Sequence, residues 1–180
     1  MQQVQIKQEN YIKEELQKCM ERVAKKQEYI FICIGVDKIT GDCFGPIVGT
    51  KLKEKLKNKN IMNISVYGDL ENNITLSNIE EYKRKLEKRH KDACMIVIDA
   101  ALSKKENIGK IYITNKPTVL GKGLCKEHMQ IGDISIKAVV GKDYKIAKYN
   151  FQILQNISLN FILKLAEQLT EEIIEYIEFH

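Results

Sequence analysis

The chain lacks several patterns that would assign it to a specialised class of protein. No segment of its 180 residues approaches the roughly 20 consecutive apolar residues of a membrane-spanning helix. The first ten residues contain no apolar stretch of signal-peptide length. Internal repeats and low-complexity linkers are also missing. We therefore expect a globular protein of the cytoplasm that has no membrane partner.

Cysteine is scarce, and its spacing is uninformative. The five cysteines form no Cys-x-x-Cys pair; they are Cys19, Cys33, Cys43, Cys94 and Cys125. Their odd number argues against a disulfide framework. Two of them, Cys43 and Cys125, lie in glycine-containing loops, where a catalytic thiol would need a nearby base. The only histidine close to either in sequence is His128.

The chain carries only a mild excess of positive charge. The net charge is +5, and lysines alternate with glutamates in runs such as residues 51–57 and 80–89. Mixed runs of this kind are typical of solvated helix faces. Nucleic-acid binding needs a basic patch on one face, so we expect no nucleic-acid partner.

Hydrophobic periodicity predicts an α/β fold. Apolar residues at helical spacing indicate that residues 1–28 hold an amphipathic helix, which packs on a single domain formed by residues 29–180. Continuous apolar runs at 29–34, 61–67 and 93–98 predict strands that are covered on both faces. Helical patterns separate these strands, which implies parallel pairing with right-handed crossovers.

The remainder of the domain adds strands and a long helix. Strand patterns at 109–114 and 131–140 flank a long loop, 116–129, and loops of this length in compact domains are often functional. A nearly unbroken apolar stripe predicts one helix over 149–176. The whole pattern predicts a three-layer α/β/α sandwich around a mostly parallel sheet.

Two aspartates stand out because each follows a strand-like run. Asp42 lies in the loop after the first strand, and Asp99 directly follows Met-Ile-Val-Ile. The carboxyl ends of parallel strands gather at one edge of a sheet, where ligands bind. We expect the two carboxylates to meet there. Such a pair either shares a proton, which suits acid–base catalysis, or binds a cation.

Each aspartate also has a structural interpretation. Asp42 has the position of an N-cap for the helix that begins near Pro46, and Asp99 has that of a cap at the end of its strand. The glycines of residues 35–45 fit neither G-x-G-x-x-G nor the P-loop pattern. Because Asp42 occupies the place of a phosphate, the sequence argues against a flavodoxin-like nucleotide binder.

Five segments of this sequence occur in the order seen in YyaC-type sporulation proteins. They are residues 35–52, 66–70, 97–101, 121–126 and 131–134. The resemblance covers roughly residues 29–175, and its most specific part is Thr-Gly-Asp-x-x-Gly-Pro at 40–46. That family resembles the spore germination protease and, more distantly, the hydrogenase maturation proteases. The resemblance implies a phosphorylase/hydrolase-like α/β/α fold.

The resemblance also implies roles for individual residues. Asp42 and Asp99 match the two essential aspartates of the germination protease. In hydrogenase maturation proteases a similar acidic pair and a loop histidine hold a metal, so Asp42, Asp99 and His128 are the candidate ligands of a divalent metal ion. The loops that are implied to contact the substrate contain Gly68, Asp69, Gly121, Gly123 and Lys126.

The activity that the resemblance implies is that of a cytoplasmic endopeptidase of a spore-forming bacterium. Its aspartate pair would hydrolyse a peptide bond in a protein or peptide substrate of sporulation, with or without a divalent metal. The alternative is a non-catalytic binding or scaffolding protein that keeps the protease fold. The sequence carries no signal for an oligomeric state.

Overall fold

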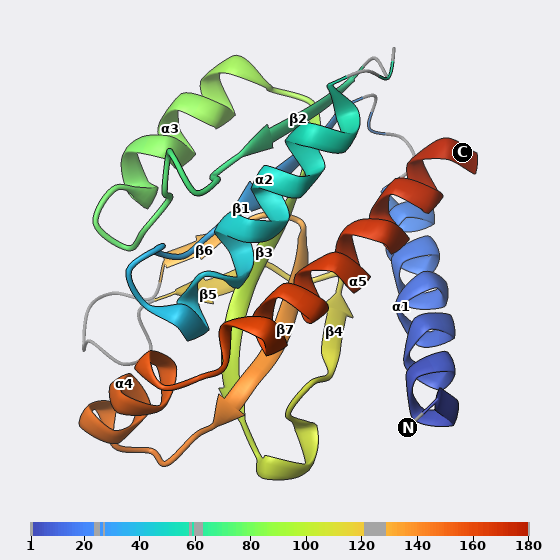
Figure 1. The fold of residues 1–180 in the computed structure, drawn as a ribbon. Helices are drawn as coiled ribbons and strands as arrows, with labels where there is room; N and C mark the ends of the chain where they lie inside the picture. Colours follow the sequence, from blue (N-terminus) through green and yellow to red (C-terminus); the bar gives the residue numbers. More distant parts are fainter. Residues whose placement is uncertain are drawn as a thin grey trace.

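The computed structural model describes residues 2–23, 26, 28–57, 59, 63–120 and 129–179. Its strands are β1 (Glu28–Cys33), β2 (Ile64–Tyr67), β3 (Ala93–Ser103), β4 (Ile111–Thr114), β5 (Thr118–Leu120), β6 (Met129–Ile131) and β7 (Ile134–Lys142). Five of them form one sheet in the order β2-β1-β3-β7-β4, and β5 pairs with β6 separately (Figure 1). The sheet is parallel except for β4, which runs antiparallel to β7 at the edge.

Helices cover both faces of the sheet. They are α1 (Gln2–Arg22), α2 (Phe44–Leu56), α3 (Ile79–Arg89), α4 (Ala147–Gln155) and α5 (Leu159–Phe179), with short 3-10 turns η1 (Thr40–Asp42) and η2 (Lys105–Asn107). One outer layer contains α2 and α5 side by side, with α1 packed on α5 and β4 (Figure 1). The other contains α3 and the β5–β6 pair. The predicted three-layer α/β/α sandwich is therefore confirmed. In the described part of the chain, no helix combines the length and the apolar character that crossing a bilayer requires.

The central strands are buried on both faces, as their continuous apolar runs predict. Alternate residues of β1 enter different apolar clusters. Phe31 and Cys33 join the cluster formed with α1, α2 and α5, whereas Ile30 and Ile32 join the smaller cluster formed with α3 and the β5–β6 pair. All four side chains are essentially inaccessible to solvent.

The prediction of one helix over 149–176 is wrong, because the chain bends between α4 and α5. The carbonyl of Ser158 accepts the first amide bonds of α5. The bend packs on Gly41 of η1, where an added Cβ would lie 2.8 Å from side-chain carbons of both Leu154 and Ile157. The close approach of a glycine thus lets α4 leave the core and lie against η1.

The segment predicted as a loop at 116–129 contains β5 and the start of β6. Thr118 is in register with Ile131, and its hydroxyl donates a buried 2.7 Å hydrogen bond to Ser135 of β7. The strand predicted at 131–140 is divided between β6 and β7. Four predicted site residues lie outside the described residues: Gly121, Gly123, Lys126 and His128.

Candidate active site

The topology of the sheet brings Asp42 and Asp99 to one edge. From β1 the chain forms β2 on one side of β1 and then crosses back to form β3 on the other. This reversal lies at the carboxyl ends of β1 and β3, the position where open α/β sheets bind ligands in a crevice. Asp42 ends η1, which follows β1, and Asp99 belongs to β3.

The sequence predicts a strand that ends just before Asp99. In the structure β3 continues to Ser103, so Asp99 lies within the strand and this prediction is wrong. The register explains why it still reaches the crevice. Cys33, the last residue of β1, pairs with Ile98. Asp99 therefore lies one residue beyond the end of β1. Strands β3 and β7 remain paired beyond Asp99, as far as Ser103 and Lys142.

Asp42 is held by the loop that precedes it. One carboxylate oxygen accepts a 3.0 Å hydrogen bond from the backbone amide of Val36. The N-cap of α2 is Cys43, which makes no side-chain capping bond, so the interpretation of Asp42 as the cap of this helix is wrong. Burial raises the pKa of Asp42, and the bond from Val36 opposes that rise.

Asp99 has a strongly perturbed carboxyl group. Burial is the main cause, and the negative charge of Asp42 adds to it, whereas Lys137 and the amide of Ala100 act in the opposite direction; together they raise the pKa of Asp99 to about 7. Turn η1, which ends at Asp42, packs against β3, which contains Asp99; that the two carboxyl groups meet stays a prediction. Their catalytic role stays a prediction.

Lys137 is a site residue that the sequence reasoning missed. It lies on β7 in direct register with Asp99, on the face opposite to Ile136 and Ala138, which enter the larger core cluster. The sequence contains one signal for it, because a lysine between the apolar residues of an inner strand is unusual and indicates a functional role. Its pairing with Asp99 depends on the register of two strands, which the sequence does not reveal.

Cys43 is buried beside the candidate site but does not have the environment of a nucleophile. Its thiol donates to the carbonyl oxygens of Val36 and Asp37, at 3.3 and 3.1 Å. Burial raises the pKa of this thiol, and the charges of Asp37 and Asp42 raise it further. A reactive cysteine needs a lowered pKa. The other candidate thiol, Cys125, lies outside the described residues.

The loop after β2 lies beside the site, and Asp69 holds it in place. Its carboxylate forms an ion pair with Lys53 of α2 and accepts a 2.6 Å bond from the amide of Asn72. Burial works to raise the pKa of Asp69, but these partners together lower it. Asn73 then accepts a 2.8 Å bond from the amide of Asp37. Asp69 thus has a structural role, and its contact with a substrate stays a prediction.

Gly68, the other predicted residue of this loop, permits a close backbone contact. Its φ is +85°, and an added Cβ would lie 2.0 Å from the carbonyl oxygen of Cys33. A side chain at this position would separate the loop from the end of β1. Gly68 therefore brings the loop up to the crevice.

The described residues do not form a metal centre by themselves. Among them, no group of three His, Cys, Asp or Glu side chains converges as metal ligands do. Asp42 and Asp99 supply two carboxylates, and the cation of Lys137 already lies opposite Asp99. The third predicted ligand, His128, is outside the described residues.

Comparison with solved structures assigns the fold to the class of hydrogenase maturation proteases. The HycI protease of Thermococcus kodakarensis KOD1 superimposes with a TM-score of 0.57 over 85% of this chain and 94% of that chain, at 21% sequence identity. At this identity the similarity establishes the fold.

The family model described as "Protein of unknown function (DUF1256)" matches residues 3–172, so the chain belongs to the DUF1256 family. The uncharacterized protein YyaC of Bacillus subtilis (strain 168) is 31% identical over 150 residues, which are 83% of this chain and 70% of that protein. The resemblance to YyaC-type proteins is confirmed.

Proposed function

We propose that this protein is a peptidase that hydrolyses a peptide bond in a protein substrate during spore formation. The observation that carries the proposal is the pair of acids at the carboxyl ends of β1 and β3, where the charge of Asp42 adds to the rise in the pKa of Asp99. Paired acids with perturbed pKa values are typical of sites that transfer protons. The protease-like fold and the similarity to YyaC support this reading.

The two acids have different environments, which suggests different roles. The Val36 amide favours the ionised form of Asp42, whereas the pKa of Asp99 is raised to about 7. We therefore assign Asp42, whose carboxylate accepts the Val36 bond, as the base, and Asp99 as the acid. Lys137, in register with Asp99, limits how far the pKa of Asp99 rises.

The proposed reaction uses both groups. Asp42 accepts a proton from a water molecule while the water oxygen attacks the peptide carbonyl carbon, and the proton of Asp99 stabilises the developing negative charge on the carbonyl oxygen. The tetrahedral intermediate then collapses. Asp42 returns its proton to the leaving amine as the carbon–nitrogen bond breaks, and Asp99 regains its own. The products are one new carboxyl group and one new amino group.

A protein substrate is supported by the surface next to η1. Helix α4 lies against η1, and large apolar and aromatic side chains on it and on the segment before it are about half exposed: Tyr144, Ile146, Tyr149 and Phe151. Exposed apolar side chains that cluster in this way commonly mark interaction surfaces. Because α4 packs on η1, which ends at Asp42, a partner bound to these side chains would lie near the candidate site.

The test is to identify the peptide bond that the protein cleaves. New amino termini would be mapped by mass spectrometry in an extract of sporulating bacilli treated with the wild-type protein or with the double variant Asp42→Asn/Asp99→Asn. A matched control is Asp92→Asn, which changes an exposed acid just before β3. We expect new termini with the wild type and the control only. Equal cleavage by the double variant would overturn the mechanism, and no cleavage by any folded sample would favour a non-catalytic scaffold.

A further inference from the structure

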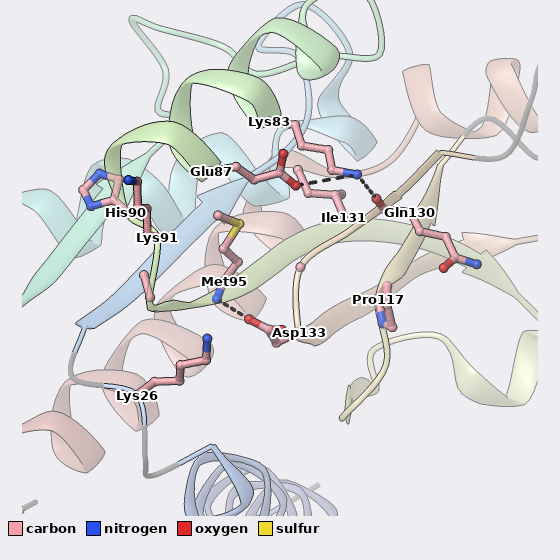
Figure 2. Close-up of a pocket in the computed structure, with 12 residues that line it drawn as sticks. Lys26, Lys83, Glu87, His90, Lys91, Met95, Pro117, Gln130, Ile131 and Asp133 are labelled. Atoms are coloured by element: carbon pink, nitrogen blue, oxygen red, sulfur yellow. Dashed lines mark hydrogen bonds and ion pairs between the residues drawn. The ribbon is translucent and has the colours of Figure 1, made fainter.

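A second pocket, with a volume of about 440 Å³, opens near the amino end of β3 (Figure 2). It is lined by residues of α3, β6 and the start of β3, and neither Asp42 nor Asp99 lines it. Volumes of this size are typical of small-molecule sites. The site proposed above leaves this pocket without a role.

Hydrogen bonds fix two walls of the pocket. The amide of Met95 donates to the carboxylate of Asp133 at 2.9 Å, and the amide of Asp133 donates back to the carbonyl of Met95 at 2.7 Å (Figure 2). Across the pocket, the Lys83 ammonium donates to the carbonyl of Gln130 at 2.9 Å and lies 3.8 Å from Glu87. These bonds tie α3 to β6 and tie the turn after β6 to β3.

His90 fixes a third wall. It is 8% exposed, its Nδ1 lies 2.7 Å from the carboxylate of Glu28, and its Nε2 lies 2.8 Å from the hydroxyl of Tyr67. Both ring nitrogens are therefore engaged by the protein. His90 therefore holds the end of α3 in place. Its ring nitrogens are not available to a ligand, whereas the neighbouring lysines can bind one.

Two ammonium groups at the pocket have no acidic partner within the part of the chain that the structure describes. Lys26 and Lys91 line it, and neither forms an ion pair with any of the described residues. In contrast, Lys83 forms an ion pair with Glu87, and the carboxylate of Asp133 accepts a hydrogen bond from the amide of Met95. The rest of the lining includes apolar side chains: Ala93, Met95, Pro117 and Ile131.

We propose that this pocket binds a small organic phosphate. A phosphate monoester carries a charge of about −1.5 to −2 at pH 7, which Lys26 and Lys91 can neutralise as point charges. Its organic part then lies on Met95 and Ile131. The volume of the pocket fits a small molecule. The proposal is independent of the peptidase function.

The test uses phenyl phosphate as the probe and the ¹⁵N-labelled full chain. We expect titration to shift the amide signals of Met95, Gln130 and Ile131, with inorganic phosphate binding more weakly because it lacks an apolar part. Lys26→Gln/Lys91→Gln should weaken binding by at least about tenfold, because two charge-assisted contacts are lost. The matched control, Lys104→Gln/Lys105→Gln, removes two exposed lysines elsewhere and should bind as the wild type does.

Several results would overturn the proposal. They are equal weakening in both double variants, shifts spread over lysine-rich surfaces instead of the pocket, and equal affinity for inorganic and phenyl phosphate. Unchanged signals outside the pocket show that the variants are folded. Asp42→Asn/Asp99→Asn should bind phenyl phosphate with wild-type affinity, so failure of the peptidase proposal and failure of this one are distinguishable.

Discussion

The negative charge of Asp42 raises the pKa of the Asp99 carboxyl group, although the two residues belong to segments far apart in the chain. Their proximity results from the order of the strands: β1 lies between β2 and β3, and the crevice opens where the chain reverses direction across the sheet. Two acids that interact in this way titrate as a pair and not independently.

The stability of the protein should fall as the pH rises from about 4 to 7. The pKa of Asp99 is about 7 in the folded state, compared with 3.8 ordinarily. Between these values the folded state binds the proton and the unfolded state does not, so each pH unit costs at most about 1.4 kcal/mol of unfolding free energy. Urea unfolding at pH 5 and pH 8 measures this loss.

The Asp99→Asn variant provides the control for that measurement. It removes the titrating group, so it should lose less stability than the wild type between pH 5 and pH 8. Asp92→Asn, at an exposed position, should behave as the wild type does. An unchanged pH dependence in Asp99→Asn would show that other groups are responsible.

Lys137 should set the alkaline limit of activity. The proposed mechanism needs a proton on Asp99, so hydrolysis should decline above about pH 7, and Lys137 lowers the pKa of Asp99. Replacement of this cation in Lys137→Met should move the alkaline limb of the pH–rate profile upward. The exposed Lys104→Met serves as the control. If the alkaline limb does not move in Lys137→Met, Lys137 does not lower the pKa of Asp99 and this prediction is wrong.

The sequence predicts the parts of this protein that depend on local patterns. Uninterrupted apolar runs predict β1 and the first part of β3, although β3 continues past Asp99 to Ser103. The register that places Lys137 opposite Asp99 depends on two distant strands and has no local signal. The bend at Ser158 likewise depends on contact with Gly41, whereas the apolar stripe continues across it.

Cys43→Ser should retain hydrolysis, because the thiol acts as a hydrogen-bond donor to Val36 and Asp37 and not as a nucleophile. A serine hydroxyl can donate to the same carbonyls. The rate is measured on a peptide that contains the mapped cleavage site, with circular dichroism to verify folding. Complete loss of activity in a folded Cys43→Ser variant would instead support a catalytic thiol.

Gly68→Ala should destabilise the protein more than Gly109→Ala. Both glycines have positive φ, +85° and +89°, so both substitutions incur the cost of a left-handed residue, about 1 kcal/mol. Only at Gly68 does the new Cβ meet the carbonyl of Cys33, at 2.0 Å; at Gly109 the nearest contact is 3.8 Å away. The clash should add about 2 kcal/mol, measured by urea unfolding. Equal losses would show that the loop shifts freely.

Hydrolysis should persist in the presence of a chelator. The Lys137 cation lowers the pKa of Asp99, as a bound metal ion would. The acids can activate water by proton transfer alone. The rate is compared with and without the chelator, for the wild type and for His128→Ala. If the chelator and His128→Ala both abolish cleavage, and added divalent metal restores the chelated wild type, then the pair acts through a metal ion and the acid–base mechanism is wrong.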